Sequence, residues 1–96
     1  MERRYRLTIA AREVGLPVRQ VRHYVSIGLL PATPVEQGDL LLDDVGLARL
    51  RKIHRLRSDV GLNTAGIEVA LRLLDQIEEL HAELERLRPR SASDMR

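Results

Sequence analysis

Glycine and proline constrain this 96-residue chain most, because they interrupt every periodic apolar segment after a few turns. The interruptions fall at Gly15, Pro17, Gly28, Pro31, Pro34, Gly38, Gly61 and Pro89. The segments between them predict helices over residues 9–14, 18–26, from 43 or 44 to Gly61, and 64–87. The proline-containing stretch 29–42 predicts a small two-stranded wing. The chain is therefore expected to be mostly α-helical.

Residues of suitable chemistry stand at these predicted boundaries. Thr8 is a favourable N-cap for the first helix, and Pro17 suits the start of the second because it has no N–H to leave unpaired. Asp43 or Asp44 would cap the third helix and Asn63 the fourth. In the wing, Leu29-Leu30 and Leu40-Leu41-Leu42 are the two apolar pieces expected to pair.

Composition narrows the classes of function. The chain has no Cys, which excludes disulfides, thiolate metal sites and cysteine nucleophiles. It also has no Phe or Trp. His23, His54 and His81 lie on three different predicted helices without metal-binding spacing, so we expect no enzyme, no metal site and no cofactor. No apolar run is long enough for a membrane span and no signal peptide is evident, so a cytoplasmic location without membrane attachment is expected.

Charge is distributed unevenly along the chain. Residues 1–57 contain eleven basic and six acidic side chains, whereas residues 58–96 contain five basic and eight acidic ones. A basic N-terminal part is consistent with nucleic-acid binding.

Two short helices joined by a tight turn form a helix-turn-helix pattern, in which the second helix enters the major groove of DNA. Arginine can donate two hydrogen bonds to guanine, and tyrosine can donate to a phosphate. The candidate DNA-binding residues are Arg12, Arg19, Arg22, His23 and Tyr24.

The wing favours a protein partner instead. Residues 35–44 contain Glu36, Asp39, Asp43 and Asp44 and no basic side chain. Phosphate contacts supply much of the affinity for DNA, so such a wing cannot hold DNA by charge. An acidic, leucine-rich surface suits a basic protein partner better, and these four carboxylates are the candidate partner-binding residues.

The last predicted helix contains an apolar seam with the spacing of a coiled coil. Its members are Ala70, Leu73, Ile77, Leu80, Leu84 and Leu87. Leu71 and Leu74 widen the stripe at one end, which predicts that this end packs on the rest of the chain. The seam itself predicts a homodimer.

The segment Thr8–Pro31 resembles the N-terminal winged helix-turn-helix domain of MerR-type regulators. The resemblance is carried by Val18-Arg19-x-x-Arg22-x-Tyr24-x-x-x-Gly28-Leu29-Leu30. The segment Gly61–Leu71 is similar to one shared by two stress-related branches, the heat-shock repressors (HspR) and the chaperone modulators (CbpM). The repressors bind operator DNA, and the modulators bind the J-domain of a DnaJ-like co-chaperone and restrain it.

The expected organisation is a MerR-like winged helix-turn-helix domain over 1–62, a dimerisation helix over 63–88, and a tail over 89–96 whose low apolar content predicts disorder. The acidic wing, the Val69–Ile77 segment and the absence of sequence for an effector domain favour the modulator branch. The arginines of the second helix favour a dimeric regulator bound to double-stranded DNA. Both functions remain open at this point, with the modulator preferred.

Overall fold

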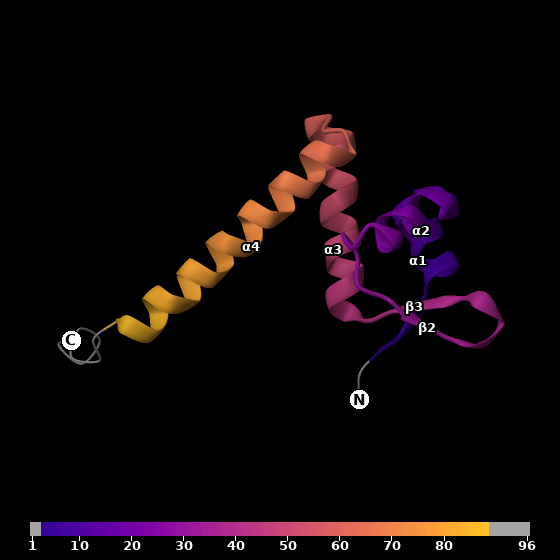
Figure 1. Cartoon of the computed structure of the whole chain (residues 1–96), viewed down its shortest axis with the longest axis horizontal. Coiled ribbons are helices and arrows are strands. Elements are labelled where there is room, and N and C mark those ends of the chain that lie inside the picture. Colours follow the sequence, from indigo (N-terminus) through magenta and orange to yellow (C-terminus); the bar gives the residue numbers. More distant parts are fainter. Residues whose placement is uncertain (1–2, 89–96) are drawn as a thin grey trace.

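The computed structural model describes residues 3–88 and consists of a small helical body from which one long helix projects (Figure 1). The elements in chain order are β1 (Tyr5–Arg6), α1 (Leu7–Val14), α2 (Val18–Ser26), β2 (Thr33–Pro34), η1 (Glu36–Gly38), β3 (Leu40–Leu42), α3 (Asp44–Arg55), η2 (Leu56–Val60) and α4 (Thr64–Leu87). The expected mostly helical fold is confirmed. The predicted tail 89–96 lies outside the described residues.

Helices α1 and α2 form the expected pair, with one correction. Gly15 ends α1 in the left-handed conformation at φ 90°, and its N–H donates to the Ala11 carbonyl. Pro17 precedes α2, and the backbone turns away at Gly28, where φ is 83°. Thr8 is not the N-cap but lies inside α1, which begins at Leu7, two residues earlier than predicted and directly after strand β1. Burial of Leu7 extends the helix beyond the position that the capping pattern indicated.

The wing has three strands rather than the expected two, in the order β1-β3-β2. Both edge strands pair antiparallel with β3, with Tyr5 opposite Leu42 and Thr33 opposite Leu41. The predicted first strand at Leu29-Leu30 is wrong, because the strand lies at Thr33–Pro34 and the two leucines connect α2 to it with their side chains in the core. The N-terminal lead-in supplies the third strand.

One aliphatic core joins all the helices to β3. Its members are Leu7, Ala10, Ala11, Leu16, Val21, Tyr24, Leu29, Leu30, Leu42, Leu50, Ile53, Ile67 and Leu71. Burying a side chain of this size stabilises the fold by about 1.5–3 kcal/mol. Val45, whose spacing placed it with the core side chains of α3, is instead 70% exposed.

The predicted caps of the last two helices are confirmed. The Asp43 carboxylate accepts from the Gly46 N–H at 2.7 Å, and the Asn63 side chain accepts from the Gly66 N–H at 2.8 Å. The helical path of α3 continues through the wider turn η2 to Gly61, where φ is 82°. Helix α4 then spans the predicted residues 64–87.

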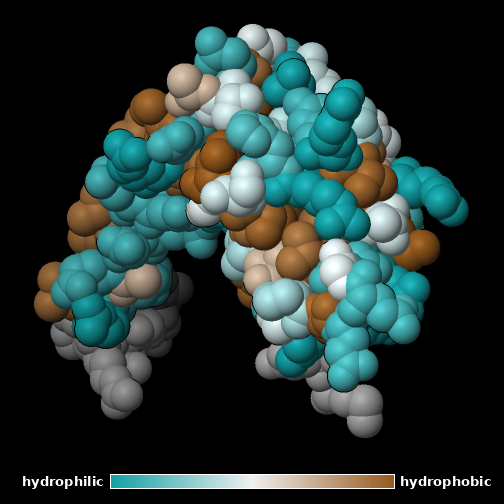
Figure 2. Space-filling view, turned by 45° about the vertical axis from the view of Figure 1, so that its right-hand side comes forward, coloured by the Kyte–Doolittle hydropathy of each residue, from teal (hydrophilic) through white to brown (hydrophobic). Residues whose placement is uncertain are grey.

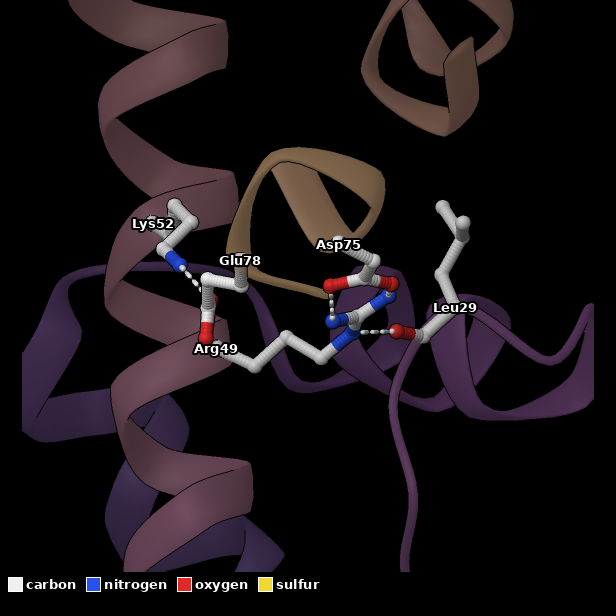
Figure 3. A network of polar contacts seen from close by, with 5 residues as sticks. All are labelled: Leu29, Arg49, Lys52, Asp75 and Glu78. Carbon is white, nitrogen blue, oxygen red and sulfur yellow. Dashed lines mark hydrogen bonds and ion pairs between the residues drawn. The ribbon is translucent and has the colours of Figure 1, made fainter. Parts of the chain in front are cut away.

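Helix α4 is attached to the body by its first half. Ile67 and Leu71 are buried, as Leu71 was expected to be, and Leu74 packs against the core. Beyond this contact a polar network fixes the helix (Figure 3). The Arg49 guanidinium donates to the Leu29 carbonyl at 2.7 Å and makes two bonds of 3.2 Å to the Asp75 carboxylate. Lys52 lies 3.9 Å from Glu78.

The second half of α4 extends away from the body (Figure 1). The larger seam side chains are exposed: Leu73 just before this half at 52%, and within it Ile77 at 48%, Leu80 at 63%, Leu84 at 64% and Leu87 at 70%. No helix within residues 3–88 has the length and apolar character needed to cross a membrane.

Replacing Arg49 by Met should lower the free energy of unfolding by about 1–3 kcal/mol, because the Leu29 carbonyl loses its donor and Asp75 loses its partner. Urea denaturation followed by circular dichroism measures the change. Arg51→Met is the matched control, since Arg51 is exposed on the same helix, and it should change stability by less than about 0.5 kcal/mol. Equal effects of the two substitutions would contradict the role given to Arg49.

Candidate functional site

Helix α2 presents a polar face to solvent. Its residues Val21 and Tyr24 are buried, while Arg19, Arg22 and His23 are exposed. Arg12, near the end of α1, is exposed as well. Four of the five candidate DNA-binding side chains are thus accessible on the helix pair.

Arg22 also has a partner within the chain. Its Nη1 atom donates to the Gly38 carbonyl at the tip of the wing, at 3.4 Å. The wing tip turns through two consecutive left-handed residues, Gln37 at φ 70° and Gly38 at φ 78°. This long bond brings the wing tip beside α2, so Arg22 has a structural contact as well as an exposed surface.

Tyr24 does not face outward, and the expected orientation is wrong. Its side chain is fully buried, and its hydroxyl accepts a hydrogen bond from Arg57 of η2 at 3.3 Å. With its amide oxygen turned toward them, Gln20 accepts from both Arg57 and the Tyr24 hydroxyl at 2.9–3.0 Å. Burial of a large ring in a core without Phe or Trp explains this inward position. Tyr24 therefore links α2 to η2 and is not available to a phosphate.

Three of the four candidate partner-binding carboxylates have structural partners. Asp43 caps α3, and Asp44 accepts from the Tyr5 hydroxyl at 2.7 Å. Asp39 accepts from the Leu40 N–H at 2.8 Å and lies 3.8 Å from the Arg6 guanidinium. Glu36 is exposed in η1. The four residues therefore lie along the wing and its junction with α3.

Strand β1 brings basic charge to this wing, which the sequence reasoning missed. Arg6 stands opposite Leu41 in the sheet, and its side chain is 70% exposed. This strand has only two residues, Tyr5 and Arg6, and such a segment is too short to show the alternation that indicates a strand. The wing is consequently a mixed-charge surface rather than a purely acidic one.

His23, His54 and His81 lie on three different helices, α2, α3 and α4. Among residues 3–88, no three His, Cys, Asp or Glu side chains gather in a way that could hold a metal ion. His54 lies 3.3 Å from the Ser58 hydroxyl, one helical turn along the chain.

Three comparisons place the chain among known proteins. A family model described as MerR HTH family regulatory protein matches residues 7–89. The chain is 27% identical over 86 residues to chaperone modulatory proteins CbpM of Escherichia coli O1:K1 and O139:H28, covering 90% of this chain and 85% of those proteins. It is also similar to HiNmlR, a MerR family regulator lacking the sensor domain, in a crystal structure bound to promoter DNA. That match has 26% identity and a TM-score of 0.63, and it covers 88% of this chain and 67% of the other.

The hydrogen bond to Asp44 raises the pKa of Tyr5 above its ordinary value of 10.0. Because the folded state holds this proton more tightly than the unfolded state, stability should fall as pH rises above 10.0 toward the folded pKa. In a Tyr24→Phe background Tyr5 is the only tyrosine, so the absorbance of phenolate reports its pKa directly. Adding Asp44→Ala should lower that pKa, and an unchanged titration would show that the bond is not formed in solution.

Proposed function

Since the chain belongs to the MerR HTH family of regulatory proteins, we propose that it is a chaperone modulator, which binds the J-domain of a DnaJ-like co-chaperone and restrains it. The observation that carries this proposal is the similarity to chaperone modulatory proteins over 90% of the chain and 85% of their length. The match therefore includes the wing and most of α4, and extends well beyond the helix-turn-helix.

The chemistry of the wing supports the same proposal. Between Thr33 and Leu42 the wing has two carboxylates, Glu36 and Asp39, and no basic residue. The cation that β1 brings to the sheet, Arg6, lies 3.8 Å from Asp39, so the β2–β3 part of the wing adds little to phosphate binding. A protein surface, in contrast, can be recognised by carboxylates and leucines together.

We further propose that the protein acts as a homodimer through the seam of α4. Within residues 3–88 nothing covers the seam, and its five exposed apolar side chains form one stripe from Leu73 to Leu87. Isolated helices of this length are marginal in water, so a second copy would both cover the stripe and stabilise the projecting half.

The proposed function is tested with the J-domain of a DnaJ-like co-chaperone from the organism that makes this chain. Isothermal calorimetry with nuclease-treated protein should show binding, and saturating protein should suppress the J-domain-stimulated ATPase of Hsp70. The basal ATPase of Hsp70 is the control and should not change. No binding at concentrations up to about 100 µM would contradict the proposal.

A second candidate function, sequence-specific DNA binding by the dimer, is favoured by one observation. Arg19, Arg22 and His23 are exposed together on α2, and the similar regulator HiNmlR was crystallised on promoter DNA. In this function Arg12 would lie near the DNA backbone, and the two α2 helices of a dimer would read two half-sites.

Selection from a random-sequence duplex library tests this second function. If it holds, one inverted repeat is enriched, and its affinity falls steeply with salt. Arg19→Ala should weaken binding of the enriched duplex by about 1–3 kcal/mol, because Arg19 is exposed on α2 and its contact with a base would be lost. Leu80→Glu should weaken it by breaking the dimer, and Arg86→Ala on α4 is the control. Failure to enrich any sequence would contradict DNA reading.

A further inference from the structure

A hollow separates the projecting half of α4 from the body, and hydrophobic side chains gather on the body beside it (Figure 2). This cleft is lined on the body side by the end of α2, the connection to β2 and the start of α3. The apolar lining residues are Val25, Leu29, Leu30, Pro31, Ala32 and Val45. Val45 is 70% exposed although it stands in a well-formed helix, so this wall offers an apolar contact that the chain itself does not cover.

The opposite wall of the cleft is acidic. Asp75 lines the groove together with Arg49 at its closed end. Leu71, which is buried against the body, is followed on the same face of α4 by Glu78 and Glu85, at intervals of seven residues or about two turns. Both glutamates are exposed, and this spacing places them in one row of carboxylates that continues along α4 beyond the cleft residue Asp75.

The cations near the cleft leave these carboxylates accessible. Arg49 is occupied by Asp75 and the Leu29 carbonyl. Lys52 lies 3.9 Å from Glu78, whose side chain is still 72% exposed, and a pair of that kind contributes little and is readily exchanged. Glu85 lies 3.7 Å from Arg88, with both side chains about two-thirds exposed.

An apolar wall that faces an acidic wall suits one kind of occupant. We propose that the cleft binds a positively charged amphipathic helix of a partner protein, with its apolar face on Val45 and Leu29 and its basic face toward Glu78 and Glu85. This inference rests on the proposed function, in which the partner is the J-domain. It places the main contact in the cleft rather than on the acidic residues of the wing.

The cleft stays available when α4 pairs with a second copy. Leu73, Ile77, Leu80 and Leu84 lie roughly a third of a turn around α4 from the row that contains Leu71 and Glu78. A second α4 packed on that stripe would therefore cover a different flank. One helix can then serve dimerisation on one side and partner binding on the other.

The test uses the full chain and the same J-domain, with two pairs of matched variants. Val45→Arg places a cation on the apolar wall, and Val60→Arg is its control, since Val60 is 63% exposed in η2. Glu78→Lys reverses one charge of the acidic wall, and Glu79→Lys is its control on the neighbouring position of α4. Circular dichroism verifies folding, and sedimentation velocity gives the oligomeric state of each variant.

We expect Val45→Arg to weaken J-domain binding about tenfold or more and Glu78→Lys about threefold or more, with both controls within about twofold of the wild type. In ¹⁵N spectra, the amides of Leu29, Val45 and Glu78 should shift on titration with the J-domain. If the wild type binds the J-domain and neither variant weakens this binding, the cleft is not the binding site, while the proposed function still holds.

Two further outcomes also overturn this inference. If Glu36→Lys weakens binding and Val45→Arg does not, the partner docks on the wing. If Val45→Arg changes the oligomeric state, a second copy occupies the cleft. A wild-type chain that does not bind the J-domain at all contradicts the proposed function itself, and is recognised by the absence of heat and of shifts in the unmodified protein.

Discussion

Beyond its buried residues Ile67 and Leu71, the position of α4 depends most on one guanidinium group. Arg49 of α3 joins the carbonyl of Leu29, where α2 gives way to the wing, to the carboxylate of Asp75 on α4. Apolar packing ends near Leu74, so beyond that point no buried side chain of α4 opposes its rotation away from the body. The bidentate geometry of an arginine–carboxylate pair restrains direction as well as distance. The angle between α4 and the body, and with it the width of the cleft, follows from this contact.

Local chemistry explains why much of this fold is predictable from sequence. Asp43 and Asn63 cap helices through bonds to residues three positions ahead, and Gly15 and Gly61 end helices at left-handed φ values. These interactions need no knowledge of the tertiary structure. The bounds of α2 and α4 were accordingly predicted to the residue, whereas Thr8 failed as a cap because the burial of Leu7 in the core decided where α1 starts.

The features that sequence reasoning missed all join distant parts of the chain. Strand β1 exists only because Tyr5 and Arg6 meet β3 more than 30 residues later. The Tyr24 hydroxyl meets Arg57, and Arg49 meets Asp75, across similar separations. Neither periodicity nor capping patterns can predict such pairs, because both depend only on residues within a few turns of each other in the sequence. Of the candidate DNA-binding residues on α2, Arg19, Arg22 and His23 are exposed as the pattern predicted, whereas Tyr24 belongs to the core.

The arginines of α2 do not by themselves decide between the two candidate functions. Arg22 donates to the wing tip, so it has a structural role even in a protein that does not bind DNA. Arg19 has no such bond within the described residues. The apolar wall of the cleft begins at Val25, so it shares no side chain with the exposed row of Arg19, Arg22 and His23. Two surfaces without common residues can be gained or lost separately. Substitutions that remove the exposed arginines therefore leave the contacts of Tyr24 and Arg49, and the lining of the cleft, in place.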